Sequence, residues 1–178
     1  MYKNLVKEHL PEISDNQILC EPSRNNTAPC VAYTAFKLHN LNPEANFIIA
    51  PSDALILKEA AFLNKIQTAL DFTEKNEALC TLGISPTRPD TGYGYINFVE
   101  GKGEVKKVLQ FKEKPDKVTA EKYLASGTYL WNAGIFIWKA KSVLNAFEEH
   151  ANQIYRVLGE GKSDYNTNSE QALSLIHI

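Results

Sequence analysis

The sequence predicts an α/β fold whose mixed, mostly parallel sheet is flanked by helices, and two observations indicate it. Residues 46–50 and 78–84 are apolar runs bounded by turn residues, which is typical of strands buried on both faces. A helix-like stretch, 54–70, separates them. A strand–helix–strand unit of this kind normally joins parallel strands by a right-handed crossover.

The segments before this unit follow the same alternation. Residues 2–9 read as a short helix and residues 17–20 as a strand. Thr27 is placed to cap a helix that ends near Asn40, with Pro29 in its first turn, where proline is tolerated. We therefore expect a strand–loop–helix arrangement to lead into the first apolar strand.

The pattern then changes to a hairpin. Residues 93–99 and 105–111 are strand-like and are joined by a glycine-containing turn at 101–104, which is the usual signal for two antiparallel strands.

The remaining elements alternate again. A short helix at 119–126 is expected to end at Gly127, which can adopt the left-handed conformation. Residues 129–138 form the longest strand candidate, and 141–158 read as helical, in one or two pieces.

Composition narrows the class of protein. The 178 residues are 44% hydrophobic and 22% charged, which is ordinary for a globular domain. The formal net charge is −2, so a nucleic-acid partner is not expected. Cys20, Cys30 and Cys80 show no metal-ligand or disulfide spacing. No apolar run approaches the roughly 20 residues of a membrane span, and we expect a cytoplasmic protein.

We assign residues 1–172 to one domain. The apolar residues 173–178 follow a polar segment and end abruptly. We interpret them as a non-native tail and exclude them from the fold. The alternative is an ordinary terminal strand.

Asp53 directly follows the first apolar strand. Open α/β sheets bind ligands at the carboxyl ends of their parallel strands, and a carboxylate there can hold Mg²⁺ together with phosphate oxygens. A helix N-cap formed by Ser52 or Asp53 is an equal alternative from the spacing alone.

The loop at 21–29 offers the amide of Asn26 and the hydroxyl of Thr27 at a helix N-terminus, where an anion or a base edge could bind. A simple capped turn is the alternative. Gly94, at the start of a strand, would let a ligand approach the backbone, although glycines are also common in hairpins.

Three further side chains follow or begin strands. Glu113 and Lys114 place a carboxylate beside an ammonium group, which suits sugar hydroxyls and a phosphate, although such a run is more often a solvated face. Asn132 is the one polar residue of an apolar run and needs partners. A bond to neighbouring backbone is the alternative to a ligand.

Four segments together resemble one family, the mannose-1-phosphate guanylyltransferases. They are Glu21-Pro22-Ser23-Arg24-Asn25-Asn26-Thr27-Ala28-Pro29, Thr91-Gly92-Tyr93-Gly94-Tyr95, Phe111-Lys112-Glu113-Lys114-Pro115 and Trp131-Asn132-Ala133-Gly134-Ile135-Phe136-Ile137-Trp138. The first departs from the family pattern, because Asn25 stands where the family has an arginine and Arg24 comes one residue earlier. The role of Arg24 is therefore open.

The resemblance implies a Rossmann-like nucleotide-diphospho-sugar transferase fold and a reaction of GTP with mannose 1-phosphate. It implies Mg²⁺ as cofactor, with Asp53 as metal ligand and Asp53 and Lys114 as catalytic residues. Nucleotide contacts carry over to Glu21, Asn26 and Thr27. Sugar-phosphate contacts carry over to Gly94, Glu113, Lys114 and Asn132.

The family's N-terminal glycine-rich triphosphate loop has no counterpart in the 178 residues. We therefore expect an incomplete domain that is inactive alone, and the resemblance leaves homo-oligomerisation of the full-length enzyme open. Two alternatives are a nucleotidyltransferase for another hexose 1-phosphate and a noncatalytic domain that binds sugar phosphates or subunits.

Overall fold

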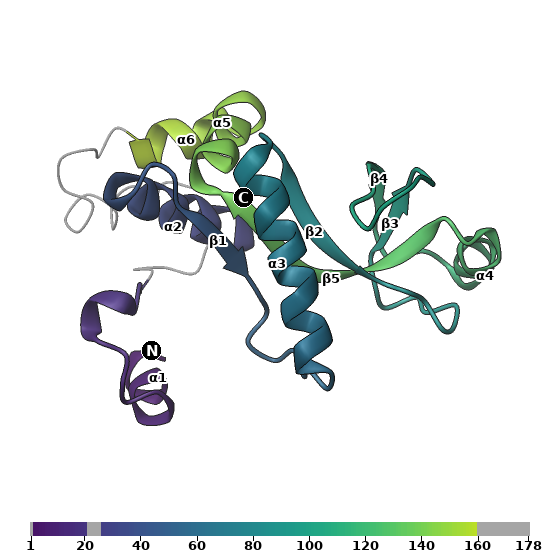
Figure 1. The fold of residues 1–178 in the computed structure, drawn as a ribbon, viewed down its shortest axis with the longest axis horizontal. Helices are drawn as coiled ribbons and strands as arrows, with labels where there is room; N and C mark the ends of the chain where they lie inside the picture. The colour runs from purple at the N-terminus through teal and green to yellow at the C-terminus, as the bar shows by residue number, and fades with distance from the viewer. Residues whose placement is uncertain (1, 21–25, 160–178) are drawn as a thin grey trace. The chain divides into compact units, whose positions relative to one another are not determined.

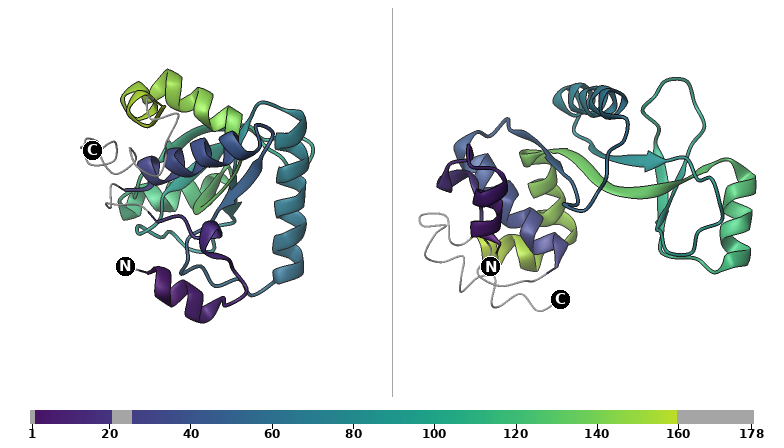
Figure 2. Two further views of the ribbon diagram at one scale, coloured as in Figure 1. Left: turned by 90° about the vertical axis from the view of Figure 1, so that its left-hand side faces the viewer. Right: turned by 90° about the horizontal axis from the view of Figure 1, so that it is seen from below.

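The computed structural model describes residues 2–20 and 26–159, which divide into two compact units (Figures 1 and 2). Residues 1–45 and 140–178 make up the first, which we call the helical unit. Residues 46–139 make up the second, the sheet unit. Each unit has its own packing and is described separately.

The described part of the helical unit contains α-helices and one 3₁₀ turn. These are α1 (Lys3–His9), η1 (Asp15–Gln17), α2 (Thr27–Leu41), α5 (Ala140–His150) and α6 (Asn152–Gly159). Helices α2, α5 and α6 pack on one another through apolar faces that include the buried Phe36, Leu144 and Leu158. The ring of Phe36 lies 5.3 Å from that of Tyr155. The predicted helices at 2–9 and 141–158 are confirmed, the latter in two pieces.

The sheet unit consists of a sheet flanked by two helices (Figure 1). Its strands are β1 (Asn46–Ile49), β2 (Leu79–Ile84), β3 (Tyr95–Phe98), β4 (Val108–Lys112) and β5 (Tyr129–Lys139). Its helices are α3 (Glu59–Lys75) and α4 (Lys117–Ser126). The predicted hairpin, the long strand and the helix that ends at a left-handed Gly127 are confirmed.

Strand β5 organises this sheet. Strands β1 and β2 both pair with Phe136, Ile137 and Trp138, so they must lie on opposite edges of β5. Strand β3 pairs with residues 129–131, and β4 extends the sheet beyond β3.

The predicted mostly parallel pairing is wrong, although the α/β class with flanking helices is confirmed. Every strand pairing that the structure describes is antiparallel. Since β1 and β2 are both antiparallel to β5, they run in the same direction, as the strand–helix–strand pattern predicts. They do not pair because β5, which is distant in sequence, occupies the position between them.

Each helix of the sheet unit covers its own hydrophobic cluster. Helix α3 contributes Ile66 and Ala69, which pack on Ile135 and Ile137 of β5. Helix α4 contributes Ala120, which packs on Tyr95 and Trp131. The two clusters therefore anchor opposite ends of the same long strand.

Three boundary predictions need correction. Residues 17–20 form no strand, because Ser14 and Gln17 make a capping box that turns the chain into η1. Helix α3 begins at Glu59, with Lys58 as its N-cap, rather than near residue 54. The N-cap of α2 is Asn26, and Thr27 is already its first helical residue.

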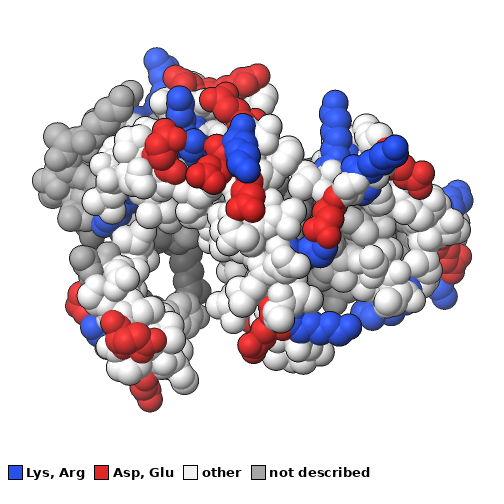
Figure 3. All heavy atoms as spheres, viewed as in Figure 1, with Lys and Arg blue, Asp and Glu red and all other residues white. Residues whose placement is uncertain are grey.

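Acidic and basic side chains are interspersed on the visible face of the molecule (Figure 3). The three cysteines are free thiols. None of the helices that the structure describes is long and apolar enough to span a membrane.

Candidate functional site

The predicted sugar-phosphate residues lie on adjoining strands of the sheet unit. Tyr95 of β3 pairs with Lys112 of β4 and with Trp131 of β5. This register places Gly94 next to Asn132 on one side and level with Glu113 on the other. The Gly94 carbonyl accepts a hydrogen bond of 2.8 Å from the Asn132 N–H. The structure therefore brings Gly94 and Asn132 into direct contact, with Glu113 at the end of the neighbouring strand.

The side-chain oxygen of Asn132 has a hydrogen-bond partner nearby in the sequence, whereas its side-chain nitrogen does not. Its Oδ1 accepts a hydrogen bond of 3.0 Å from the Gly134 N–H, so the backbone alternative holds for the oxygen. Its Nδ2 makes no hydrogen bond within the described part of the chain. Because the side chain is half-buried, the remaining donors are oriented and can serve a hydroxyl group.

Gly134 joins this region to the loop after β1. Its φ of 68° lies in the left-handed region, and strand β5 bulges here relative to β2, between the pairings of Thr81 and Gly83. A Cβ at residue 134 would lie 3.4 Å from Cγ of Pro51. The turn at 51–53 therefore lies against the bulge that follows Asn132, and glycine adopts the left-handed φ of that bulge at little cost.

Asp53 lies in that turn and is exposed. The N-cap alternative is excluded for both Ser52 and Asp53, because helix α3 begins at Glu59 and its N-cap is Lys58. Mg²⁺ usually takes one or two protein carboxylates and completes its shell with phosphate oxygens and water. An exposed single carboxylate on a loop fits that arrangement, so Asp53 could hold the metal together with a substrate phosphate.

Glu113 and Lys114 are both exposed and follow β4 directly. The structure gives neither side chain a hydrogen bond or ion pair to any residue that it describes. Pro115 and Asp116 come next, and the Asp116 carboxylate caps α4 by accepting from the Thr119 N–H at 2.9 Å. The pair is thus held at a fixed strand end but remains free to bind a ligand.

The predicted nucleotide-binding residues belong to the helical unit. Asn26 and Thr27 are exposed at the N-terminus of α2, and Asn26 has a left-handed φ of 66°. Asn26 makes no side-chain capping hydrogen bond within the described part of the chain, which argues against a turn capped by Asn26. Glu21 and Arg24 lie outside the described residues.

Sequence reasoning missed an ordered loop between β2 and β3. The Asp90 carboxylate accepts hydrogen bonds from the Gly92 N–H at 2.8 Å and from Arg88 Nε at 2.9 Å. The hydrogen bond from Gly92 lowers the pKa of Asp90 most, and the charge-assisted bond from Arg88 lowers it further, so this pKa lies below its ordinary value. The spacing Asp-x-Gly, typical of a side-chain-to-backbone turn, is the signal that could have found it.

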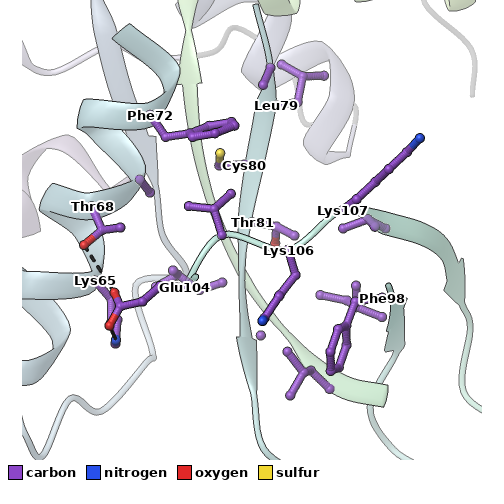
Figure 4. Close-up of a pocket in the computed structure, with 18 residues that line it drawn as sticks. Lys65, Thr68, Phe72, Leu79, Cys80, Thr81, Phe98, Glu104, Lys106 and Lys107 are labelled. Atoms are coloured by element: carbon purple, nitrogen blue, oxygen red, sulfur yellow. Dashed lines mark hydrogen bonds and ion pairs between the residues drawn. The ribbon is translucent and has the colours of Figure 1, made fainter. Parts of the chain in front are cut away.

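A pocket of about 830 Å³ lies elsewhere in the sheet unit, between α3, β2 and the hairpin (Figure 4). None of the predicted site residues lines it. Its carboxylate, Glu104, is bound to Lys65 at 2.6 Å. Burial raises the pKa of the Cys80 thiol, which disfavours a reactive thiolate. The pocket therefore offers no catalytic group to compete with the strand-end residues.

Comparison with known proteins gives the family. Residues 1–173 match the family Nucleotidyl transferase. The chain is 42% identical over 132 residues to the xanthan biosynthesis protein XanB of Xanthomonas campestris pv. campestris, which covers 74% of this chain and 28% of that protein. It is 39% identical over 160 residues to the mannose-1-phosphate guanylyltransferase RfbM of Salmonella typhimurium, covering 87% and 33%.

The fold is shared with a crystal structure from Thermus thermophilus, described as a mannose-1-phosphate geranyltransferase. The TM-score is 0.84 at 24% identity, over 97% of this chain and 49% of that one. The chain spans about a third of the length of the two sequence relatives above. The match along nearly the whole sequence, together with this fold, shows that the chain belongs to the nucleotidyl transferase family.

Proposed function

We propose that this chain provides the sugar-phosphate half of a mannose-1-phosphate guanylyltransferase. One observation carries the proposal: Gly94 and Asn132 are hydrogen-bonded to each other at the same end of the sheet where Glu113 and Lys114 lie exposed, with no partner among the described residues. A carboxylate, an amide and an ammonium group together suit a phosphorylated sugar. Relatives named as mannose-1-phosphate guanylyltransferases support the choice of sugar.

In the proposed reaction, an oxygen of mannose 1-phosphate attacks the α-phosphorus of GTP. The new phosphorus–oxygen bond forms GDP-mannose as the bond to the leaving pyrophosphate breaks. Glu113 accepts hydrogen bonds from sugar hydroxyls, and the Asn132 amide donates to another. Lys114 neutralises the sugar phosphate and so lowers its repulsion with the nucleotide.

The remaining groups complete the proposal. Asn26 and Thr27, with Glu21, bind the guanine nucleotide at the start of α2. Mg²⁺, when bound at Asp53, supplies positive charge to the phosphates. We also infer a cytoplasmic location for the protein.

The reaction is tested in a protein in which this chain is extended to the length of its relatives. With GTP, mannose 1-phosphate and Mg²⁺, we expect GDP-mannose and pyrophosphate. Removing one charge-stabilising group can reduce the rate by about 10²–10³, so Asp53→Asn should remove most of the activity. Asp71→Asn, at an exposed acidic position on α3, is the matched control and should keep it.

The 178 residues alone should give no product in the same assay, since they contain no glycine-rich triphosphate loop. Robust pyrophosphate release from them, or full activity in Asp53→Asn, would show that other residues carry the chemistry.

A further inference from the structure

The loop between β2 and β3 is held by bonds that converge on Asp90. Oδ1 accepts from the Gly92 N–H at 2.8 Å, and Oδ2 accepts from Arg88 Nε at 2.9 Å and pairs with its Nη2 at 2.7 Å. The main-chain oxygen of Asp90 accepts from the Tyr95 hydroxyl at 2.8 Å. Asp90 thus connects Arg88 before it, Gly92 after it and Tyr95 of strand β3.

Arg88 connects the same loop to β5. Its guanidinium lies over the ring of Trp131, 5.3 Å from the ring centroid. Tyr93 contacts the same indole, with ring centroids 5.2 Å apart. Trp131 is only 8% exposed, and its indole N–H has no acceptor among the described residues. Contact with Arg88 and Tyr93, rather than a hydrogen bond from the indole, therefore fixes this side of the ring.

These contacts lead to the candidate site. Trp131 immediately precedes Asn132, and Tyr93 immediately precedes Gly94. The Asn132 N–H donates to the Gly94 carbonyl at 2.8 Å. Movement of the loop away from Trp131 would therefore disturb both residues on which the sugar-phosphate proposal depends.

We propose that Asp90 is a positioning residue for the sugar-phosphate site, acting through Arg88 and Gly92. The inference rests on the proposed function and adds to it a residue that does not itself touch the sugar. Glycine-containing loops lose much conformational entropy on ordering, and a loop already ordered in the free protein avoids that loss when ligand binds. Asp90 provides this order by joining the loop to Trp131 and β3.

Amide hydrogen exchange on the 178-residue chain tests the positioning step without a ligand. In Asp90→Ala, the Gly92 and Asn132 amides should exchange at least about tenfold faster, which corresponds to a change of about 1.4 kcal/mol in opening. Asp90→Asn, which can still accept from Gly92 but cannot form the ion pair, should show a smaller change. Asp116→Ala is the matched control: it removes an acidic residue that accepts from the Thr119 amide at 2.9 Å. It should speed exchange at the start of α4 and leave the Gly92 and Asn132 amides unchanged.

Titration of the same variants with mannose 1-phosphate, followed by NMR, tests the consequence. Asp90→Ala should weaken binding about tenfold, whereas Asp116→Ala should bind as the unmodified chain does. Arg88→Ala should add little in the Asp90→Ala background, because residues that act as a unit are non-additive.

Three results would overturn the inference. They are unchanged exchange at Asn132 in Asp90→Ala, unchanged affinity despite faster exchange, and equal weakening by Asp116→Ala. If the unmodified chain binds no mannose 1-phosphate, the proposed function fails separately, and the exchange result alone decides whether Asp90 positions Gly94 and Asn132.

Discussion

At the scale of single residues, Gly134 shows most directly how the sequence shapes the candidate site. The strand must bulge after Asn132, and its left-handed φ of 68° is one that glycine adopts at little cost. The same residue lies beside Pro51, whose Cγ would be 3.4 Å from a Cβ at this position. A glycine in a long apolar strand thus marks the place where the turn carrying Asp53 approaches β5.

Gly134→Ala should destabilise the chain by about 1–2 kcal/mol, because an L-residue in the left-handed region carries that cost. Urea unfolding measures the change. Gly101→Ala is the control, since a Cβ there meets nothing within 4 Å, and it should stay within about 0.5 kcal/mol of the unmodified chain. Equal stability of the two variants would contradict the role given to Gly134.

Residue types suggested exposed polar candidates for ligand binding but did not reveal the contacts that support them. Glu113 and Lys114 could be named as candidates because a carboxylate and an ammonium group follow a strand, and both are exposed in the structure. A solvated face was the commoner alternative for such a run. The Asp-x-Gly spacing could have shown the turn at Asp90, but not its link to the candidate site. That link depends on Arg88 lying over Trp131, which is 43 positions away in sequence (131 − 88). For Asn132 each of the two alternatives describes one part of the side chain. Its oxygen accepts from the nearby Gly134 N–H, as the backbone alternative expects, while its NH₂ group has no partner among the described residues and can donate to a ligand.

At the scale of secondary-structure elements, α1 is the least securely packed helix of those described. It has seven residues and buries none of them, and so short a helix is marginal alone. Lys3 and Lys7 of α1 both pair with Asp15, at 3.0 Å and 2.6 Å. These hydrogen bonds and charges lower the pKa of Asp15 to about 2.

Because the folded-state pKa of Asp15 is below its ordinary value, its contribution to stability is present above about pH 4 and is lost as the pH falls through about 2. An NMR titration should give a pKa near 2 for this carboxylate, and Lys3→Ala with Lys7→Ala should return it towards 3.8. Lys75→Ala, at the end of α3 in the other unit, should leave it unchanged. An ordinary pKa in the unmodified chain would mean that α1 is not held this way.

Element types were more predictable than element pairings. The apolar runs at 46–50 and 78–84 predicted β1 and β2 because periodicity and turn residues are local properties. Their antiparallel pairing was missed because it depends on β5, which begins 45 positions after β2 ends (129 − 84). The strand predicted at residues 17–20 was wrong because strand-like composition alone does not make a strand. No strand among the described residues pairs with this segment.

At the scale of the whole molecule, the sheet unit exposes two strand edges that carry little protection. Strands β1 and β2 contain no charged residue, and each pairs only with β5 among the described strands. Ile48, Leu79 and Ile84 on these strands are 43–52% exposed. Uncharged, apolar edges of this kind favour association between chains.

We therefore expect the 178-residue chain to be marginally stable and to self-associate as its concentration rises. Ile84→Lys should reduce association, because a charge on an edge strand opposes pairing with another chain, whereas Ile84→Val should not. Size-exclusion chromatography and thermal unfolding measure both effects. A monomer with a sharp cooperative transition in the unmodified chain would contradict this expectation.

If the sheet unit binds a sugar phosphate through Glu113 and Asn132, titration with mannose 1-phosphate should detect the binding. The unmodified chain should bind. Glu113→Ala and Asn132→Ala should each weaken binding by about one to two decades, since losing a partner from a charge-assisted or desolvated contact costs roughly 1.5–3 kcal/mol. Gly101→Ala should bind normally. Unchanged affinity in both site variants, or no binding by the unmodified chain, would contradict the account.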